Sequence, residues 1–423
     1  MILFKLDWTQ LRADLMQAYL DARRHKRNRR YQLDFEADLE ANLDRLTDEL
    51  YNRTYKPLPP DCFIITDPKK REVFAASFRD RVVHHLYYNY VHEMFERTFI
   101  ADSYSCIKRR GTHYGIRRLV SHIRKESRNY KEDCHVLKMD IRGYFMHINR
   151  NRLLELCFDT IDRMAMHKTG KYRSRFWSEV IDISFVKYLT REIVLLDCTA
   201  DCHLKGCPSD WNGLQPSKSL FHSPEGCGLP IGNLTSQLFS NVYLNMLDQY
   251  MKRTLKCRHY GRYVDDFYVV SADRDWLHSL IPQVRAFLKD ELGLTLHEGK
   301  LRIDSVRQGV EFLGAYLKPW RMLVSRSTLR RMKPKLRALA MSVKAGCLTF
   351  EQLRPSLNSF LGVLGHYRSY RLRKAMLNSL PYCNFTKLGS FTLSYDRFVN
   401  AIGCSSSSNP AIMSIIVKPM LCH

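Results

Sequence analysis

The sequence lacks the features that would tie it to a membrane or to secretion. None of its 423 residues lies in an apolar run of 18, which is about the length that a membrane-spanning helix needs. Residues 1–30 contain no apolar core followed by small residues, so no secretion signal is predicted. We therefore expect a cytoplasmic protein that does not bind a membrane. The 13 cysteines are then expected as reduced thiols, not as a disulfide framework.

A regular metal-binding spacing is also missing from the cysteines. Cys198, Cys202, His203, Cys207 and Cys227 lie close in the sequence, but their spacings match no usual zinc finger. We favour separate buried or surface thiols, and a zinc site is the less favoured alternative.

Acidic residues are scarce beside basic ones, with 43 Asp and Glu against 67 Lys and Arg and a net charge of +24. A chain this basic is expected to bind a polyanion, with an affinity that falls steeply as salt rises. The densest basic run is Arg23–Arg30. It is either the solvated face of a helix or a contact for RNA, and the overall charge favours the contact.

Two adjacent carboxylates stand between two apolar runs, in the segment Tyr263-Val-Asp-Asp266. The aromatic and β-branched residues of Arg258–Tyr263 and Phe267–Ser271 favour strands, so a β-hairpin with both carboxylates at its tip is predicted. Like charges this close repel each other, and a hard divalent ion would remove that cost. The alternative is a solvated turn, because Asp is common in turns.

A third carboxylate ends another short apolar run, His135–Ile141. Two-metal sites need carboxylates from separate strands that converge on ions about 3.5–4 Å apart. Asp140 and Asp265 are the predicted shared ligands, the Ile141 carbonyl is a further candidate oxygen, and Asp266 is expected to support the site. Alternatively, Asp140 caps the turn that follows it.

The order of these and other motifs resembles that of a reverse transcriptase over about residues 60–320. The matching segments, in chain order, are Arg71, Arg79-Asp-Arg81, Asp140, Gly228–Gln237, Tyr263–Asp266, Gly293–Lys300 and Val310–Gly314. The resemblance implies an RNA-directed DNA polymerase with two Mg²⁺ ions, for which Mn²⁺ could substitute. One ion would activate the primer 3′-hydroxyl and the other would neutralise the triphosphate. Template RNA, primer, dNTPs and the cDNA product are the implied partners.

Further roles follow from the resemblance, position by position. Phe145 matches the steric gate that excludes a ribose 2′-hydroxyl, whereas its neighbour Tyr144 is expected in the core. Arg71 matches a residue that clamps the triphosphate, although basic runs of this kind are often solvated loops. Lys300 matches a proton donor to pyrophosphate, with a surface lysine as the alternative.

The resemblance also places a primer grip and the polymerase subdomains. Phe312, Leu313 and Gly314 match the grip, and a strand with a Gly bulge is the alternative. The expected fold is α+β, a right hand with an antiparallel palm sheet and a helical thumb. The expected parts are an N-terminal basic helical extension (1–55), fingers (56–135), palm (136–320, with an insertion at about 150–225), thumb (321–400) and a flexible tail (401–423). Too few residues follow the thumb for an RNase H or maturase domain.

One block departs from most reverse transcriptases, which carry Gln-Gly, three residues and Ser-Pro. Here the block reads Ile231-Gly232, three residues and Ser236-Gln237. This variant resembles the enzymes of diversity-generating retroelements, which copy a template RNA with frequent errors opposite adenine. Gly232 lets the backbone approach a nucleotide, and Ile231 replaces an amide that would bind the substrate sugar.

Ile231 and Gln237 are therefore predicted to favour misincorporation, because specificity is a difference in transition-state binding. The resemblance adds a small basic accessory protein and a retroelement template RNA as partners, and mutagenised cDNA as product. The alternative is an antiphage-defence reverse transcriptase that makes a toxic or signalling DNA.

Overall fold

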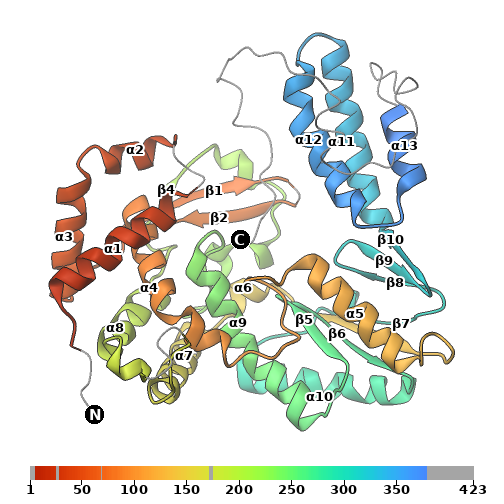
Figure 1. The fold of residues 1–423 in the computed structure, drawn as a ribbon, viewed down its shortest axis with the longest axis horizontal. Helices are drawn as coiled ribbons and strands as arrows, with labels where there is room; N and C mark the ends of the chain where they lie inside the picture. The colour runs from red at the N-terminus through yellow and green to blue at the C-terminus, as the bar shows by residue number, and fades with distance from the viewer. Residues whose placement is uncertain (1–4, 25–27, 68, 171–174, 379–423) are drawn as a thin grey trace. The chain divides into compact units, whose positions relative to one another are not determined.

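A computed structural model describes residues 5–24, 28–67, 69–170 and 175–378. These residues fall in two compact units (Figure 1). The first unit comprises the described parts of Met1–His122 and His135–Ile303, and the second comprises those of Ile123–Cys134 and Asp304–Leu421. The expected tail at 401–423 lies outside the described residues.

Four helices open the first unit. The Asp7 side chain accepts a hydrogen bond from the Gln10 amide and so caps the first helix. The second and third helices are separate because Asp38 leaves helical geometry at φ −133° and ψ 52°. The first helix packs against the third and fourth. The four are α1 (Trp8–Arg23), α2 (Arg30–Glu36), α3 (Leu39–Tyr51) and α4 (Phe78–Glu96).

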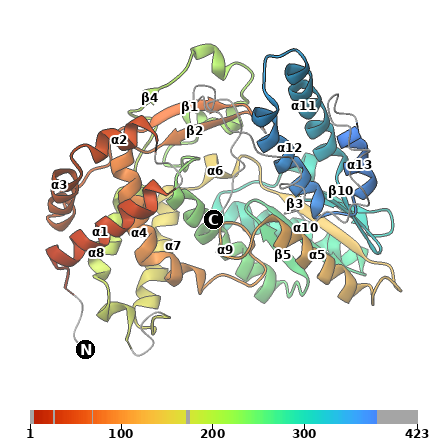
Figure 2. The same ribbon diagram turned by 45° about the horizontal axis from the view of Figure 1, so that its top comes forward.

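A small three-stranded sheet lies beside these helices (Figure 2). Strands β1 (Asp61–Ile65) and β2 (Arg71–Ala75) form an antiparallel hairpin. Strand β4 (His203–Leu204) pairs in parallel with β1, so the insertion near residue 200 contacts the strand at Asp61 and Cys62. The hairpin carries Arg71 at the first residue of its second strand.

The second sheet of this unit holds the predicted carboxylates. Its strand order is β5-β6-β3-β7, and β3 and β6 are antiparallel neighbours at its centre. A continuous hydrophobic core connects β3 and β6 with α4 and the longer helices of the unit. The strands are β3 (His135–Asp140), β5 (Tyr260–Tyr263), β6 (Asp266–Ser271) and β7 (Arg302–Ser305). The helices are α5 (Thr112–Glu126), α6 (Tyr144–His147), α7 (Arg150–Ala165), α8 (Ile183–Val194), α9 (Leu234–Gln249) and α10 (Arg274–Leu292).

The second unit combines a three-stranded meander with helices. Strands β8 (Val310–Phe312), β9 (Ala315–Lys318) and β10 (Arg321–Val324) are antiparallel neighbours. Helix α11 (Arg326–Lys344) packs against α12 (Phe350–Gly365), and α13 (Tyr370–Asn378) follows. Across the described ranges, no helix is both long and apolar enough to cross a membrane.

One buried histidine, His84, makes the stability of the fold depend on pH. Burial and the nearby charges of His85 and Arg81 lower the pKa of His84 to about 3, while its Nδ1 lies 3.2 Å from Thr235 Oγ1. Between pH 6.5 and about 3 the unfolded chain therefore binds more protons than the folded one, so stability falls as pH falls. We expect a loss of about 1.4 kcal/mol per pH unit from this residue. Urea unfolding of wild type and His84→Gln at pH 7 and pH 5 measures this loss. If the free energy of unfolding fell equally in both proteins between the two pH values, the prediction would be contradicted.

Candidate active site

The tight turn between β5 and β6 sets the position of the acidic pair. Tyr263 pairs with Asp266 across the hairpin, so Val264 and Asp265 form the two-residue turn. The prediction that both acids lie at the tip is therefore wrong for Asp266, which is the first residue of β6. Val264 has φ +55°, as primed hairpin turns require. A β-branched residue rarely adopts this conformation, which costs about 1–3 kcal/mol.

Asp140 reaches the same place from the neighbouring strand. It ends β3 directly opposite Asp266 in the antiparallel register, so Asp140, Asp265 and Asp266 gather at one end of the sheet. The Nζ atom of Lys300 lies 2.8 Å from both carboxylate oxygens of Asp140. The Ile141 side chain is buried, and this residue bridges to Leu296 in the segment that leads to Lys300.

Burial and mutual repulsion destabilise the ionised form of this cluster. Burial, followed by the charge of Asp140, raises the pKa of Asp265 to about 6. Burial and the charges of Asp140 and Asp265 raise the pKa of Asp266 to about 7. The positive charges of Lys300 and Arg71 lower the pKa of Asp265, so both cations lie within electrostatic reach of it. Lys138 of β3, which the sequence did not suggest, does the same for Asp266.

The donor set suits a hard divalent cation, although the side chains do not form a closed cage. Among the described residues, no three His, Cys, Asp or Glu side chains are gathered as a ready metal site. Asp140 lies instead against Lys300, and two half-buried carboxylates with raised pKa, Asp265 and Asp266, lie beside it. Carboxylate oxygens are the ligands that Mg²⁺ prefers, and a divalent charge would offset the repulsion. The residues present therefore fit such an ion.

A family match covers the segment that contains these carboxylates. Residues 66–317 match the reverse transcriptase (RNA-dependent DNA polymerase) family, and this range includes all three carboxylates. The chain belongs to this family. Its mixed α and β fold is the one expected of a reverse transcriptase, so the prediction of fold class is confirmed, and the family membership supports the predicted enzyme class, an RNA-directed DNA polymerase. Members of the family generally use divalent metal ions and bind template RNA and nucleotides.

Solved structures give weaker likenesses. Apo telomerase from Candida tropicalis, truncated from the C-terminal domain, has 12% identity and a TM-score of 0.45, covering 66% of this chain and 59% of that one. Telomerase from Candida albicans in complex with a TWJ fragment of telomeric RNA has 11% identity and a TM-score of 0.44, covering 82% and 59%. This reverse transcriptase thus spans about three fifths of the telomerase chains that it matches. The comparison with curated proteins gave no match.

The predicted gate and the variant block of this reverse transcriptase pack against the same hydrophobic cluster. Phe145 and Ile231 are half-buried and pack against one cluster that contains Cys62, Phe74 and Met146. The preceding Tyr144 is buried, as expected, and donates a hydrogen bond to the Ser240 carbonyl at 2.6 Å. The gate and the variant residue therefore contribute to one apolar wall.

The glycine of the variant block is required by a protein contact. Gly232 has φ +126°, and a Cβ there would lie 2.8 Å from Val73 Cγ1. The Ile231 carbonyl accepts a hydrogen bond from the Phe74 amide at 3.0 Å. The backbone at Ile231 and Gly232 therefore approaches β2 closely, and its approach to a nucleotide stays a prediction. Gln237 is half-buried in α9.

A buried glutamate that the sequence did not reveal ties the insertion to β2. Glu72 is 1% exposed and accepts hydrogen bonds from Trp211 Nε1 (2.8 Å), Ser219 Oγ (3.0 Å) and the Leu220 amide (2.6 Å). These donors come from a stretch about 140 residues later, and the sequence offers no local signal for the pairing. The insertion is thereby fixed next to Arg71.

The segment predicted as the primer grip forms a tight turn in the second unit. Leu313 (φ +47°) and Gly314 (φ +81°) are the two turn residues between β8 and β9, and Phe312 pairs with Ala315. Two positive φ values are typical of a primed hairpin turn, so this is not a strand with a bulge. The Gly314 carbonyl accepts a hydrogen bond from the Ser325 amide at 2.9 Å, which fixes the turn against the start of α11.

The cysteines considered for zinc are differently exposed. Cys198 is buried, Cys202 and Cys227 are half-buried, and Cys207 is exposed. Cys62 of β1 lies close to two of them: it is near Cys198, and its thiol is hydrogen-bonded to that of Cys202. Burial is the largest cause that raises the pKa of Cys62, to about 12, so this thiol stays protonated at neutral pH.

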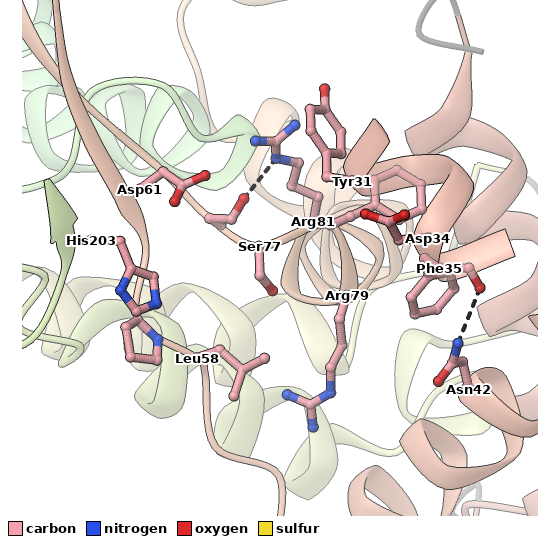
Figure 3. Close-up of a pocket in the computed structure, with 13 residues that line it drawn as sticks. Tyr31, Asp34, Phe35, Asn42, Leu58, Asp61, Ser77, Arg79, Arg81 and His203 are labelled. Atoms are coloured by element: carbon pink, nitrogen blue, oxygen red, sulfur yellow. Dashed lines mark hydrogen bonds between the residues drawn. The ribbon is translucent and has the colours of Figure 1, made fainter. Parts of the chain in front are cut away.

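A cavity of about 560 Å³ lies at the start of α4, lined also by α2 and β1 (Figure 3). The Arg81 guanidinium stacks over the Tyr31 ring at 4.8 Å, whereas Arg79 extends in another direction and pairs with Glu49. Asp34 and Asp61 balance the two arginines in the lining. The cavity therefore lacks the net positive charge that a triphosphate site requires.

Proposed function

We propose that this reverse transcriptase belongs to the diversity-generating type and makes mutagenised cDNA from a retroelement template RNA, with errors concentrated at template adenines. The observation that carries the proposal is the apolar wall of Phe145 and Ile231. A half-buried isoleucine cannot donate or accept the hydrogen bonds of a glutamine amide. The site therefore makes fewer polar contacts with the new base pair and discriminates less between correct and incorrect pairs.

In this proposal Asp140, Asp265 and Asp266 hold two Mg²⁺ ions, or Mn²⁺ in their place, with the Ile141 carbonyl as an additional oxygen. The ions, when bound, would activate the primer 3′-hydroxyl and stabilise the charge that develops on the triphosphate. Lys300 moves from Asp140 to donate a proton to the departing pyrophosphate. Arg71 binds the triphosphate, since its charge already reaches Asp265.

The remaining assignments complete the polymerase. Phe145 excludes the ribose 2′-hydroxyl, Gly232 and Gln237 support the nucleotide pocket, and Phe312, Leu313 and Gly314 hold the primer end. We assign 56–135 to the fingers, 136–320 to the palm and 321–400 to the thumb, with 1–55 as a basic extension. A small basic accessory protein and the native template RNA are the proposed partners.

The error spectrum tests the subtype. We expect Ile231→Gln to lower misincorporation opposite template adenine by about 10-fold, which corresponds to the roughly 1.4 kcal/mol that one polar contact contributes to discrimination. The measurement is sequencing of cDNA made from an adenine-rich RNA. Ile183→Gln is the matched control, because it makes the same change at another half-buried isoleucine, in α8.

Each outcome has a distinct meaning. Adenine-directed errors in wild type that fall only in Ile231→Gln support the proposal. If the errors stay unchanged in Ile231→Gln, Ile231 does not favour misincorporation. Faithful cDNA from wild type, tested with the accessory protein and native RNA present, contradicts the diversity-generating assignment and favours the antiphage-defence reading.

A further inference from the structure

Two hydrogen bonds from different parts of the first unit hold the strained turn residue Val264. Its amide donates to Ser105 Oγ at 3.1 Å, and its carbonyl accepts from Arg262 Nη1 at 3.0 Å. The first contact fixes the peptide plane before Val264, and the second fixes the plane between Val264 and Asp265. Together these planes determine the direction in which the Asp265 side chain leaves the backbone.

Asn241 of α9 links the two contacts. Its Nδ2 atom donates to the Ser105 carbonyl at 2.9 Å, and its Oδ1 atom accepts from Ser105 Oγ at 3.3 Å and from Arg262 Nη1 at 3.2 Å. Ser105, Asn241 and Arg262 are each at most 1% exposed. The two groups that hold the turn therefore form one buried network from which water is excluded.

Asp248 fixes the plane of the Arg262 guanidinium. Its two oxygens accept from Arg262 Nε at 2.8 Å and from Nη2 at 2.6 Å, and Tyr260 donates to the first oxygen at 2.6 Å. A two-point contact of this kind leaves the guanidinium one orientation. In that orientation, Nη1 points at the Val264 carbonyl.

We propose that Ser105 and Arg262 are positioning residues for the metal-binding carboxylate Asp265. They keep Val264 in a left-handed conformation that a β-branched residue otherwise avoids, and so they aim Asp265 toward its ion. The inference rests on the proposed role of Asp265 as a metal ligand. Groups that orient metal ligands change metal affinity typically by about 10–100-fold when they are replaced.

The test compares three variants of the full chain. Ser105→Ala removes the acceptor for the Val264 amide, and Arg262→Lys keeps the charge beside Asp248 but loses the planar fork. Ser103→Ala is the matched control, because Ser103 is equally buried and its hydroxyl accepts from Arg262 Nη2 at 3.3 Å, not from Val264. Two readouts are followed as Mg²⁺ is titrated: the rate of single-nucleotide primer extension on an RNA template, and the thermal unfolding temperature without nucleic acid.

We expect the Mg²⁺ concentration at half-maximal rate to rise about 10-fold in Ser105→Ala and Arg262→Lys, and less than twofold in Ser103→Ala. A loss of folded protein lowers the amplitude and leaves this midpoint in place, so the midpoint separates positioning from stability. Unchanged midpoints in the first two variants, or equal shifts in all three, overturn the inference. If wild type makes no DNA, the proposed function fails, and the midpoint of the Mg²⁺-dependent thermal shift still decides the positioning role.

Discussion

Asp265→Asn is expected to reduce primer extension on an RNA template by more than about 100-fold. The substitution keeps the size of the side chain and the hairpin turn, but it removes one anionic oxygen from the proposed two-metal site. Single-nucleotide extension under saturating Mg²⁺ and dNTP measures the loss. Asp159→Asn makes the same chemical change on the exposed face of α7 and should keep full activity.

The same variant should be at least as stable as wild type when no divalent ion is present. Asp265 is half-buried beside Asp140 and Asp266, and its raised pKa indicates that its charge is unfavourable in the folded chain. Removing this charge therefore relieves repulsion. Thermal unfolding in EDTA and in Mg²⁺ should show that the ion stabilises wild type more than Asp265→Asn. If Asp265→Asn retained polymerase activity, Asp265 would have no catalytic role. If Mg²⁺ raised the unfolding temperature of Asp265→Asn as much as that of wild type, Asp265 would not bind the ion.

The sequence predicted the strands that carry the acids because their apolar periodicity is local. The runs around Asp140 and Asp266 became β3 and β6, and their antiparallel register brings these two residues opposite each other. The position of the turn could not be read in the same way. An acidic pair favours a turn tip, but the left-handed Val264 moves the tip one residue toward the N-terminus.

Long-range polar partners account for most of what the sequence could not show. Glu72 looks like an ordinary strand residue, yet its three donors lie about 140 residues away. Arg262 stands next to the acidic motif, but its partners Asp248 and Ser103 reach it from a helix and a loop. No periodicity or spacing encodes such pairs, because each depends on how separate elements pack.

The second large effect is expected from breaking the buried ion pair of Arg262 and Asp248. Both side chains are 0% exposed. Burial alone would lower the pKa of Arg262, but the charge of Asp248 raises it overall, so the arginine is held as a cation. Arg262→Met leaves an unpaired carboxylate in the interior, and we expect the free energy of unfolding to fall by about 3–5 kcal/mol.

Urea unfolding measures this loss, and a surface pair provides the control. Arg152→Met breaks the contact with Glu155, where the two side chains are 35% and 63% exposed, and should cost at most about 1 kcal/mol. The double variant Arg262→Met/Asp248→Leu should be less destabilised than the sum of its single changes, because no charge remains buried without a partner. Additive losses would show that the pair does not act as a unit.

Catalysis should not recover along with stability in that double variant. A methionine cannot donate a hydrogen bond to the Val264 carbonyl. The peptide plane between Val264 and Asp265 therefore stays without this contact even when the double variant packs an apolar pair in the interior. We therefore expect the double variant to unfold at a higher urea concentration than Arg262→Met while its Mg²⁺ midpoint remains as high. If both properties recovered together, the arginine would serve only to neutralise Asp248, and the aim of Asp265 would depend on Ser105 alone.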